Sequence, residues 1–280
     1  MIKKIVYSSK VKKFTKFLST IIFLVNDFIM IVVAIFSNFY KYRRIYKKNL
    51  RFITGADSSH FKSLMQLCNS ISTILPESNI VVYDLGLNSN EIHKLNANKT
   101  ISKIIKFNYS EYPSFVNIKS KNFGSYAWKP LIIENELSNE KKDLILWMDA
   151  GNLVTNKLTL LKIYLTFKGF YSPHSSDNIY KRTHPTTLSL LSVPKKLFKK
   201  RNLNAAVIGV DPSNKLAKDL ISNWIEASKN KEIIGPTGSS KNNHRFDQAL
   251  LTIKFYQSNF ASFFCRSYKF FGIRIHQDID

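Results

Sequence analysis

The sequence has few cysteines, prolines and glycines. Its 280 residues include two cysteines, eight prolines and nine glycines. Two thiols can form only one disulfide, which is too few to hold a chain of this length together, so a disulfide scaffold is excluded. Cys68 and Cys265 are expected to be free. The low Pro and Gly content, with 44% hydrophobic residues, excludes collagen-like, low-complexity and disordered classes. The length allows one large domain or two small ones.

Several common functional motifs are also missing from the sequence. It contains no Walker A loop, no Gly-x-Gly-x-x-Gly and no zinc-type spacing of Cys and His. Neither cysteine stands in a recognisable nucleophile motif. These absences argue against P-loop enzymes, dinucleotide enzymes, zinc proteins and cysteine-dependent catalysis.

Acidic residues are scarce, and the basic excess is uneven. The chain carries 42 Lys and Arg against 19 Asp and Glu, a formal charge of +23. Residues 1–51 hold 12 of the basic residues and one acid, Asp27. Nearly half of the positive excess therefore lies in the first 51 residues.

A long apolar stretch, residues 17–36, lies between two basic clusters. Fourteen of its 20 residues are Leu, Ile, Val or Phe. A stretch of 20 residues is long enough to span a bilayer as a helix. Asn26 and Asp27 interrupt its centre, and a central Asp costs about 2.5 to 3.5 kcal/mol on insertion. A spanning helix and a helix or hairpin that dips into one leaflet, with its turn at Asn26-Asp27, both stay open. A buried core helix is the alternative.

The basic residues on both sides of the stretch suit anionic lipid, and the denser cluster after it favours a cytoplasmic location for the rest of the chain. We therefore expect two parts: residues 1–49, a membrane-associating segment, and residues 50–280, a domain on the cytoplasmic face. A signal peptide is disfavoured because the apolar stretch is long and no small-residue cleavage site follows it.

Strand and helix patterns alternate from residue 50 onward. This spacing predicts an α/β fold, Rossmann-like, with a mostly parallel central sheet whose strands are buried on both faces. The expected strands are residues 50–56, 79–85, 101–108, 143–149 and 205–211. The expected helices are residues 58–75, about 89–96, 124–137, 213–228 and 245–256, and a last strand is expected near the C-terminus.

Carboxylates follow three of these strands. Asp57, Asp84 and Asp149 lie at or near strand ends, and ligands of open α/β sheets bind outside the carboxyl ends of the strands. Such a carboxylate can hold a divalent metal or a sugar hydroxyl. The alternative for each is an ordinary helix cap or turn residue.

Residues 242–248 form the densest polar cluster. Asp247 is a candidate base for an acceptor hydroxyl or a group that stabilises an oxocarbenium-like state, and Gln248 is a candidate contact for sugar hydroxyls. His244 and Arg245 are candidate phosphate or metal contacts. The alternative is a helix N-terminus whose acidic residue favours the helix dipole. The preceding Gly235–Gly238 loop could close over a substrate.

The order of these motifs resembles that of GT-A fold glycosyltransferases, the nucleotide-diphospho-sugar transferases, with a family 8-like arrangement. The matching segments are Thr54-Gly55-Ala56-Asp57, Asp149-Ala150-Gly151 in the place of an Asp-x-Asp motif, Asn204-Ala205-Ala206, Asp247-Gln248, and His276 near the C-terminus. The resemblance covers residues 50–280. It departs from the family pattern at Gly151, where a second carboxylate is expected, and at Ala206, where a glycine is expected.

The resemblance implies a role for each matching segment. Thr54, Gly55, Ala56 and Asp57 would contact the donor nucleotide, Asn204 would contact substrate, and Asp149 and His276 would hold Mn²⁺ or Mg²⁺. Such an ion neutralises the diphosphate leaving group. Apart from the resemblance, the position of Lys129 on the helix before the Asp149 strand makes it a candidate contact for the donor phosphates or sugar. The alternative is a solvated helix lysine.

We therefore expect a membrane-associated glycosyltransferase that moves a hexose or related sugar from a nucleotide-diphosphate donor to a glycan or lipid-linked acceptor, in surface polysaccharide synthesis. Its partners would be the donor, the acceptor and membrane lipids, with no nucleic acid. The alternative is a basic protein that binds nucleic acid or membranes and carries a catalytically degenerate transferase-like domain.

Overall fold

A six-stranded sheet forms the centre of the part of the chain that the computed structural model describes, residues 48–138, 143–258, 260 and 271–280. Its strand order is β3-β2-β1-β4-β9-β6. β1 pairs in parallel with β2 and β4, and β2 pairs in parallel with β3, whereas β9 is antiparallel to both β4 and β6. The strands are β1 Leu50–Asp57, β2 Asn79–Gly86, β3 Ile101–Lys106, β4 Leu144–Met148, β6 Phe170–Tyr171 and β9 Val207–Val210.

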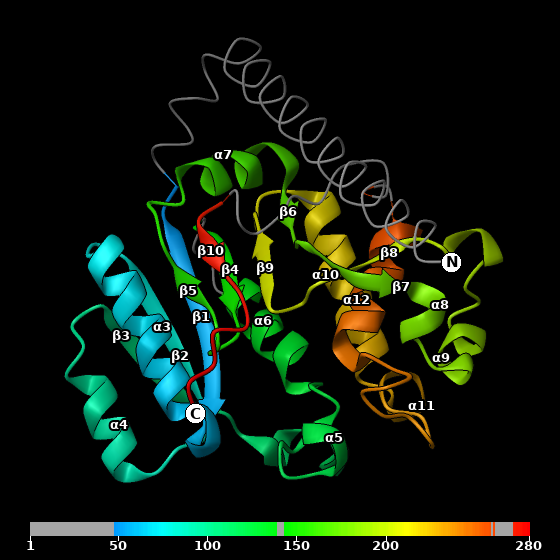
Figure 1. The fold of residues 1–280 in the computed structure, drawn as a ribbon, viewed down its shortest axis with the longest axis horizontal. Coiled ribbons are helices and arrows are strands. Elements are labelled where there is room, and N and C mark those ends of the chain that lie inside the picture. Colours follow the sequence, from blue (N-terminus) through cyan, green and yellow to red (C-terminus); the bar gives the residue numbers. More distant parts are fainter. Residues whose placement is uncertain (1–47, 139–142, 259, 261–270) are drawn as a thin grey trace, which may run out of the picture. The chain divides into compact units, whose positions relative to one another are not determined.

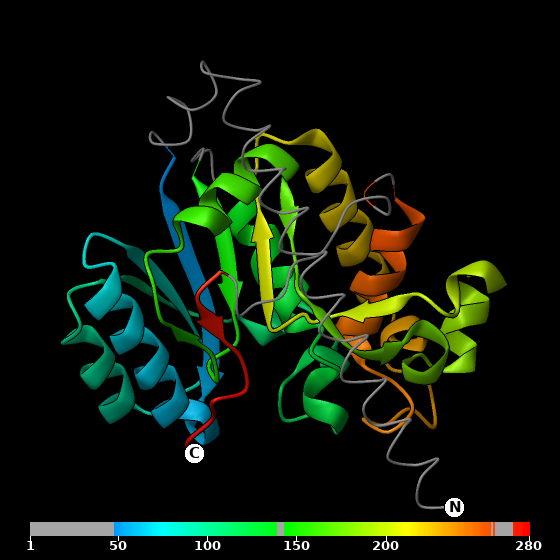
Figure 2. The same ribbon diagram turned by 45° about the horizontal axis from the view of Figure 1, so that its top comes forward.

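The sheet is buried on both faces because its central strands are apolar at consecutive positions. On one face, Ile53 and Trp147 pack against α6 (Trp128–Ser138), α10 (Lys215–Ser228) and α12 (Phe246–Gln257). On the other face, Phe52 and Leu146 pack against α3 (Phe61–Ile74) and α7 (Thr159–Lys168) (Figures 1 and 2). Each large apolar side chain buried in this way contributes about 1.5 to 3 kcal/mol.

Smaller elements complete the unit. β5 pairs with β10 and β7 pairs with β8, both antiparallel. These strands are β5 Leu153–Val154, β7 His174–Asn178, β8 Arg201–Leu203 and β10 Ile273–Arg274. The remaining helices are α4 Ser89–Asn96, α5 Lys121–Gly124, α8 Ile179–Arg182, α9 Pro185–Leu190 and α11 Lys231–Ile234, with the 3-10 turns η1 Ser58–His60, η2 Tyr109–Glu111, η3 Ser114–Val116 and η4 Lys195–Leu197.

The starts of α3 and α4 are held by different contacts. α4 is capped by Asn88, which forms a capping box with Glu91. Asp57 caps only the η1 turn, where it accepts a hydrogen bond from Ser59 N. The backbone N–H groups of Lys62 and Ser63, at the start of α3, instead donate to Asp280 Oδ1 at 2.9 and 3.2 Å. The C-terminal segment thus satisfies donors that every helix start leaves without a helical partner.

The helix expected from residue 124 begins later, at Trp128. The residues from Asn122 to Tyr126 all have positive φ, between 52° and 65°, so the chain makes a left-handed turn before α6. Four of the five residues in this turn are not glycine, and each is held in a conformation that L-residues adopt only at a cost. Position 124 requires its glycine, because a Cβ there would lie 2.3 Å from Val116 O.

The expected α/β fold with a mostly parallel sheet is confirmed for the described residues. Lys48–Asp280 forms one compact unit. The expected membrane-associating segment, residues 1–49, lies almost wholly outside the described residues. Among the helices that the structure describes, none combines the length and the apolar character needed to cross a bilayer.

Candidate active site

The parallel strands β1, β2 and β4 end at one edge of the sheet, and Asp149 leaves β4 at that edge. β9 runs the opposite way, so the residues that precede it reach the same edge. Asp149 N donates to Ala206 O at 2.9 Å, and Ala206 N donates to Asn204 Oδ1 at 3.0 Å. The antiparallel direction of β9 therefore brings Asn204 to the carboxyl end of β4.

A buried lysine joins two of the predicted site residues. Lys129, in the first turn of α6, places its Nζ 2.9 Å from Asp149 Oδ1 and 3.2 Å from Asp247 Oδ2. The same ammonium donates to the carbonyl of Ala205 at 3.2 Å. Three residues that lie far apart in the sequence thus form one group, which we call the Lys129 cluster: Lys129, Asp149 and Asp247.

The cluster is closed on most sides and open at Asp149. The side chains of Lys129 and Asp247 are 4% and 6% exposed, whereas that of Asp149 is 39% exposed. Trp147 Nε1 donates to Asp149 Oδ1 at 2.7 Å and fixes the buried side of this carboxylate. A ligand can therefore reach the cluster only through Asp149 and its immediate surroundings, as far as the described residues show.

The charges of the cluster follow from its burial. Burial disfavours the ammonium of Lys129, but the carboxylates of Asp149 and Asp247 outweigh it, so the pKa of Lys129 is raised and the group stays charged. Burial raises the pKa of Asp247 from 3.8 to about 6, although Lys129 acts in the opposite direction. Asp247 thus changes charge near neutrality, as a general base or acid requires.

Aromatic rings surround the ammonium. Lys129 Nζ lies 5.8 Å from the ring centroids of both Tyr126 and Trp147, within the range of a cation–π interaction. The ring of Tyr126 lies 6.1 Å from that of Phe246, the residue before Asp247. These rings keep water away from the cluster and strengthen its electrostatic interactions.

The C-terminal segment lies against the turn that follows β4. Gln277 N donates to Gly151 O at 2.7 Å, and His276 Nε2 lies 3.5 Å from Asn204 Nδ2. A Cβ at Gly151 would lie 2.1 Å from Asp278 Oδ1. Position 151 must therefore be glycine while Asp278 occupies this place.

The predicted metal ligands fit a divalent ion only in part. Asp149 supplies a carboxylate oxygen, which suits Mn²⁺ or Mg²⁺, and His276 would add an imidazole nitrogen. Among the described residues, however, no group of three or more His, Cys, Asp or Glu side chains could hold a metal ion. Asp149 also already pairs with the ammonium of Lys129.

The predicted nucleotide contacts fall into two groups in the structure, three buried residues and one partly exposed residue. The residues Thr54, Gly55 and Ala56 lie inside β1 and are buried, so their side chains are closed to a ligand. Their burial follows from the helices on both faces of the sheet. Asp57 ends β1 with a side chain 25% exposed and bonds to Ser59 Oγ at 2.6 Å. Of this segment, Asp57 alone offers a side chain to a donor.

His244 is not available to a ligand. It is fully buried, its Nδ1 accepts from His184 N at 3.2 Å, and its Nε2 donates to Ile234 O at 3.0 Å. Burial lowers its pKa to about 4, so the ring is neutral. The predicted phosphate or metal contact at His244 is therefore wrong in this structure, because both ring nitrogens hold the loop in place.

The neighbours of Asp247 lie where the sequence predicts, at the start of a helix. Arg245 and Gln248 are both partly exposed, and Gln248 N donates to Arg245 O at 3.0 Å. Phe246 has a φ of 45°, an unfavourable value that is held in place by the surrounding packing. The roles predicted for Arg245 and Gln248 stay predictions.

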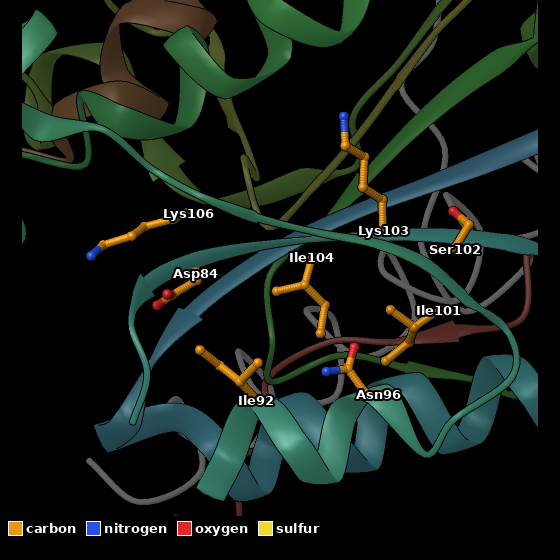
Figure 3. A pocket seen from close by; sticks show the side chains of 8 residues that line it. All are labelled: Asp84, Ile92, Asn96, Ile101, Ser102, Lys103, Ile104 and Lys106. Atoms are coloured by element: carbon orange, nitrogen blue, oxygen red, sulfur yellow. The ribbon is translucent and has the colours of Figure 1, made fainter. Parts of the chain in front are cut away.

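A separate hollow lies at the outer edge of the sheet. It encloses about 410 Å³ between α4 and β3, and Figure 3 shows Ile92 and Asn96 facing Ile101 and Ile104. β2 and β1 separate this edge strand from β4. Asp84 lines the hollow and caps the turn after β2 through Gly86 N and Leu87 N. The hollow is thus not part of the Lys129 cluster.

Sequence reasoning missed two contributors to the site. Trp147 stands two residues before Asp149. Side chains two residues apart along an extended chain point to the same face of the sheet, so this spacing could have indicated the contact. Tyr126 had no such signal, because its place depends on the left-handed turn. The pairing of Lys129 with Asp247, 118 positions apart, arises only from the fold.

Comparison with solved structures identifies the fold. The described chain is similar to the structure of WbbM, a bifunctional glycosyltransferase, with a TM-score of 0.51 and 13% identity over 76% of this chain and 38% of that chain. It is also similar to the mannosyltransferase Ktr4p from S. cerevisiae, with a TM-score of 0.52 and 6% identity over 74% of this chain and 65% of that chain. This chain thus spans less than two thirds of the length of either structure.

These similarities show that the chain has the GT-A fold, as the order of its motifs predicts. Residues 12–134 match a family model described as "Protein of unknown function (DUF1647)", which covers less than half of the chain. The comparison with curated proteins gives no significant match.

Proposed function

We propose that this chain is a glycosyltransferase that moves a sugar from a nucleotide-diphosphate donor to a glycan or lipid-linked acceptor. The observation that carries the proposal is the Lys129 cluster, which lies at the carboxyl end of β4 in a GT-A fold and opens at Asp149. Ligands of open α/β sheets bind at this edge.

The residues of the cluster suit the charges of this reaction. Sugar transfer builds positive charge on the sugar and negative charge on the departing diphosphate. The exposed oxygen surface of Asp149 can accept hydrogen bonds from donor-sugar hydroxyls, and the ammonium of Lys129 keeps that carboxylate in one position. Asp247, with a pKa of about 6, can take the proton of an acceptor hydroxyl or stabilise the positively charged sugar.

A panel of nucleotide sugars tests the proposal. The full chain should release nucleoside diphosphate from at least one donor, and Asp149→Asn should lower this rate by about 10²-fold or more, because the amide removes the charge at the opening of the cluster. Asp219→Asn, an exposed position on α10, is the matched control and should retain the rate. Circular dichroism and urea unfolding should confirm that both variants are folded.

Two results would defeat the proposal. One is no binding or turnover of any donor in the panel by the unmodified chain. The other is a normal rate in Asp149→Asn. Tight, salt-sensitive binding to DNA or RNA in place of donor binding would favour the alternative, a basic nucleic-acid-binding protein with a degenerate transferase-like domain.

We also propose that the enzyme works at a membrane, on its cytoplasmic face, in surface polysaccharide synthesis. The support is the apolar stretch of residues 17–36 between two basic clusters. The full chain should float with vesicles that contain phosphatidylserine and lose part of this binding in high salt. Recovery of the chain in the soluble fraction under all conditions would contradict this part of the proposal.

Metal dependence is a separate part of the proposal. Asp149 and His276 would hold Mn²⁺ or Mg²⁺, and the ion would supply positive charge to neutralise the departing diphosphate. The rate of donor turnover with and without a chelator measures this dependence. An unchanged rate in the presence of the chelator would show that turnover needs no metal ion, so that the positive charge at the site is that of Lys129.

A further inference from the structure

A second pocket is lined in part by the left-handed turn that precedes α6. It has a volume of about 380 Å³, and its walls come from the segment before α6 and the loop after α11. The residues that line it are Ser114, Phe115, Ser120, Lys121, Asn122, Ser125, Lys231, Gly235, Pro236, Thr237 and Ser239.

The two walls of this pocket are held together by direct contacts. Asn122 Nδ2 donates to Ser239 O at 3.3 Å. The walls approach closely at Gly235, where a Cβ would lie 2.3 Å from Ser125 Oγ and 3.3 Å from Ser125 Cβ. The pocket is therefore built by the fold, and its wall includes the left-handed turn from Asn122 to Tyr126.

The lining of the pocket combines positive charge with hydroxyl groups. Its charged side chains are Lys121 and Lys231, and none of the described residues that line it is acidic. Five of the lining residues are Ser or Thr, whose hydroxyls both donate and accept hydrogen bonds. A ligand with many hydroxyls and at least one negative charge matches this lining.

An exposed aromatic ring, Phe123, follows Asn122, one of the residues that line the pocket. This ring is 44% exposed, although large apolar side chains are usually covered. Lys241 Nζ lies 4.8 Å from the ring centroid of Phe123 and 5.7 Å from that of Tyr126. An exposed ring beside a third lysine suits a sugar face next to an anionic group.

Both walls of the pocket continue into the Lys129 cluster. Ser125 lines the pocket, and the next residue, Tyr126, places its ring 5.8 Å from Lys129 Nζ. On the other wall the chain runs from Ser239 to Phe246, which packs on Tyr126, and then to Asp247. The pocket and the Lys129 cluster are therefore formed by the same two chain segments.

We propose that this pocket holds the acceptor and selects an acceptor glycan that carries a phosphate or a carboxylate group. The proposal rests on the proposed function, because it takes the Lys129 cluster as the place where the donor sugar is held. In the proposed function the donor diphosphate leaves from the sugar at Asp149. Lys121 and Lys231 line the pocket and are not part of the Lys129 cluster, so we assign them to a different anion.

Direct binding measurements test the proposal without turnover. The full chain is titrated with glucose, glucose 6-phosphate, glucuronate and inorganic phosphate by calorimetry. Glucose 6-phosphate or glucuronate should bind about tenfold or more tightly than glucose, because a charge-assisted hydrogen bond is stronger than a neutral one. The anionic sugar that binds more tightly shows whether the charged group of the acceptor is a phosphate or a carboxylate.

Charge reversal locates the site. In the double variant Lys121→Glu with Lys231→Glu, the affinity for the anionic sugar should fall by about tenfold or more, whereas uridine diphosphate, the donor probe, should bind within about twofold of the unmodified chain. The control Lys218→Glu with Lys215→Glu makes the same charge change at exposed positions of α10 and should alter neither affinity.

Four outcomes would overturn the proposal. The first is equal affinity for glucose and the anionic sugars, and the second is an unchanged affinity for the anionic sugar in the double variant. The third is a parallel loss of uridine diphosphate binding in that variant, which would assign the lysines to the donor. The fourth is an affinity for inorganic phosphate equal to that for the anionic sugar, which would indicate a plain anion site. Failure of the proposed function would appear separately, as an absence of donor turnover, while these binding results stand by themselves.

Discussion

The helix α6 carries one buried ionic cluster at each end, and the two clusters differ in ways that matter for function. At its start, Lys129 pairs with Asp149 and Asp247. Near its end, Glu136 pairs with Arg51 and accepts a hydrogen bond from Tyr83 Oη at 2.7 Å. Lys129 is 3% and Glu136 is 2% exposed, so burial alone does not distinguish the two ends.

Charge balance and access do distinguish them. The Glu136 end has one acid and one base, and both side chains are closed, at 1% and 11% exposure. The Lys129 end has two acids for one base, and Asp149 is 39% exposed. Burial and Glu136 both raise the pKa of Tyr83, which therefore stays a hydrogen-bond donor. An unbalanced, open group at strand carboxyl ends indicates a ligand site, whereas a balanced, closed group indicates a structural ion pair.

The largest expected effect is on stability at the closed end. Arg51→Met should lower the free energy of unfolding by about 3 to 5 kcal/mol at pH 7, because it leaves Glu136 buried without its ion partner. Urea unfolding measures this loss. Turnover per folded molecule should stay the same, since the pair lies at the opposite end of α6 from Asp149.

A double variant sharpens this prediction. Adding Glu136→Gln to Arg51→Met removes the unpaired charge and should restore part of the lost stability. If Arg51→Met lowers turnover per folded molecule as strongly as it lowers stability, the distinction between the two ends of α6 is wrong.

The opposite result is expected at the open end. Lys129→Met should lower the rate of nucleotide release by about 10²- to 10³-fold, because it removes the cation that positions Asp149 and Asp247. Some stability should also be lost, so the rate is expressed per folded molecule. Lys218→Met is the matched control on the surface of α10, and a rate in Lys129→Met close to that of this control would remove Lys129 from the site.

A smaller effect is expected from pH. The pKa of Asp247 is raised to about 6 in the folded chain from an ordinary value of 3.8, so the folded state binds this proton more tightly than the unfolded state. The resulting stability is fully present below pH 3.8 and is lost as the pH rises through about 6. Asp247→Asn lacks this dependence.

Urea unfolding at several pH values between 4 and 7 measures the effect. From low to neutral pH, the unmodified chain should lose roughly 2 to 3 kcal/mol relative to Asp247→Asn. Stability curves of the two proteins that run parallel over this range would show that Asp247 does not titrate there. In the proposed reaction, a base at Asp247 also predicts a rate that falls as the pH drops below about 6.

Much of the sheet could be predicted from the sequence, because its strands are continuous apolar runs. β1, β2 and β4 begin and end within one residue of the predicted ranges. The start of α6 was predicted four residues too early, since nothing in Ser125 or Tyr126 indicates a left-handed conformation. The antiparallel direction of β9 was also hidden, because strand patterns carry no information on pairing direction.

The site could be predicted residue by residue but not as an arrangement. Asp149, Lys129 and Asp247 were each candidates, and only the fold shows that the ammonium of Lys129 joins the two carboxylates. His244 was wrong because a polar sequence neighbourhood, Asn-Asn-His-Arg, gives no sign that the imidazole is buried between backbone groups. Burial of a single polar side chain depends on contacts that lie far away in the sequence.

The contact between Asp280 and the start of α3 has a consequence for how the chain matures. Lys62 and Asp280 are separated by 218 residues, so the first long helix of the domain cannot gain its cap until translation has reached the C-terminal segment. Domains form from the N-terminus during synthesis, and contacts of such large sequence separation are slow to close. On the ribosome, the nascent domain therefore passes through a state in which the backbone donors at the start of α3 are exposed and the turn at Gly151 is not yet covered.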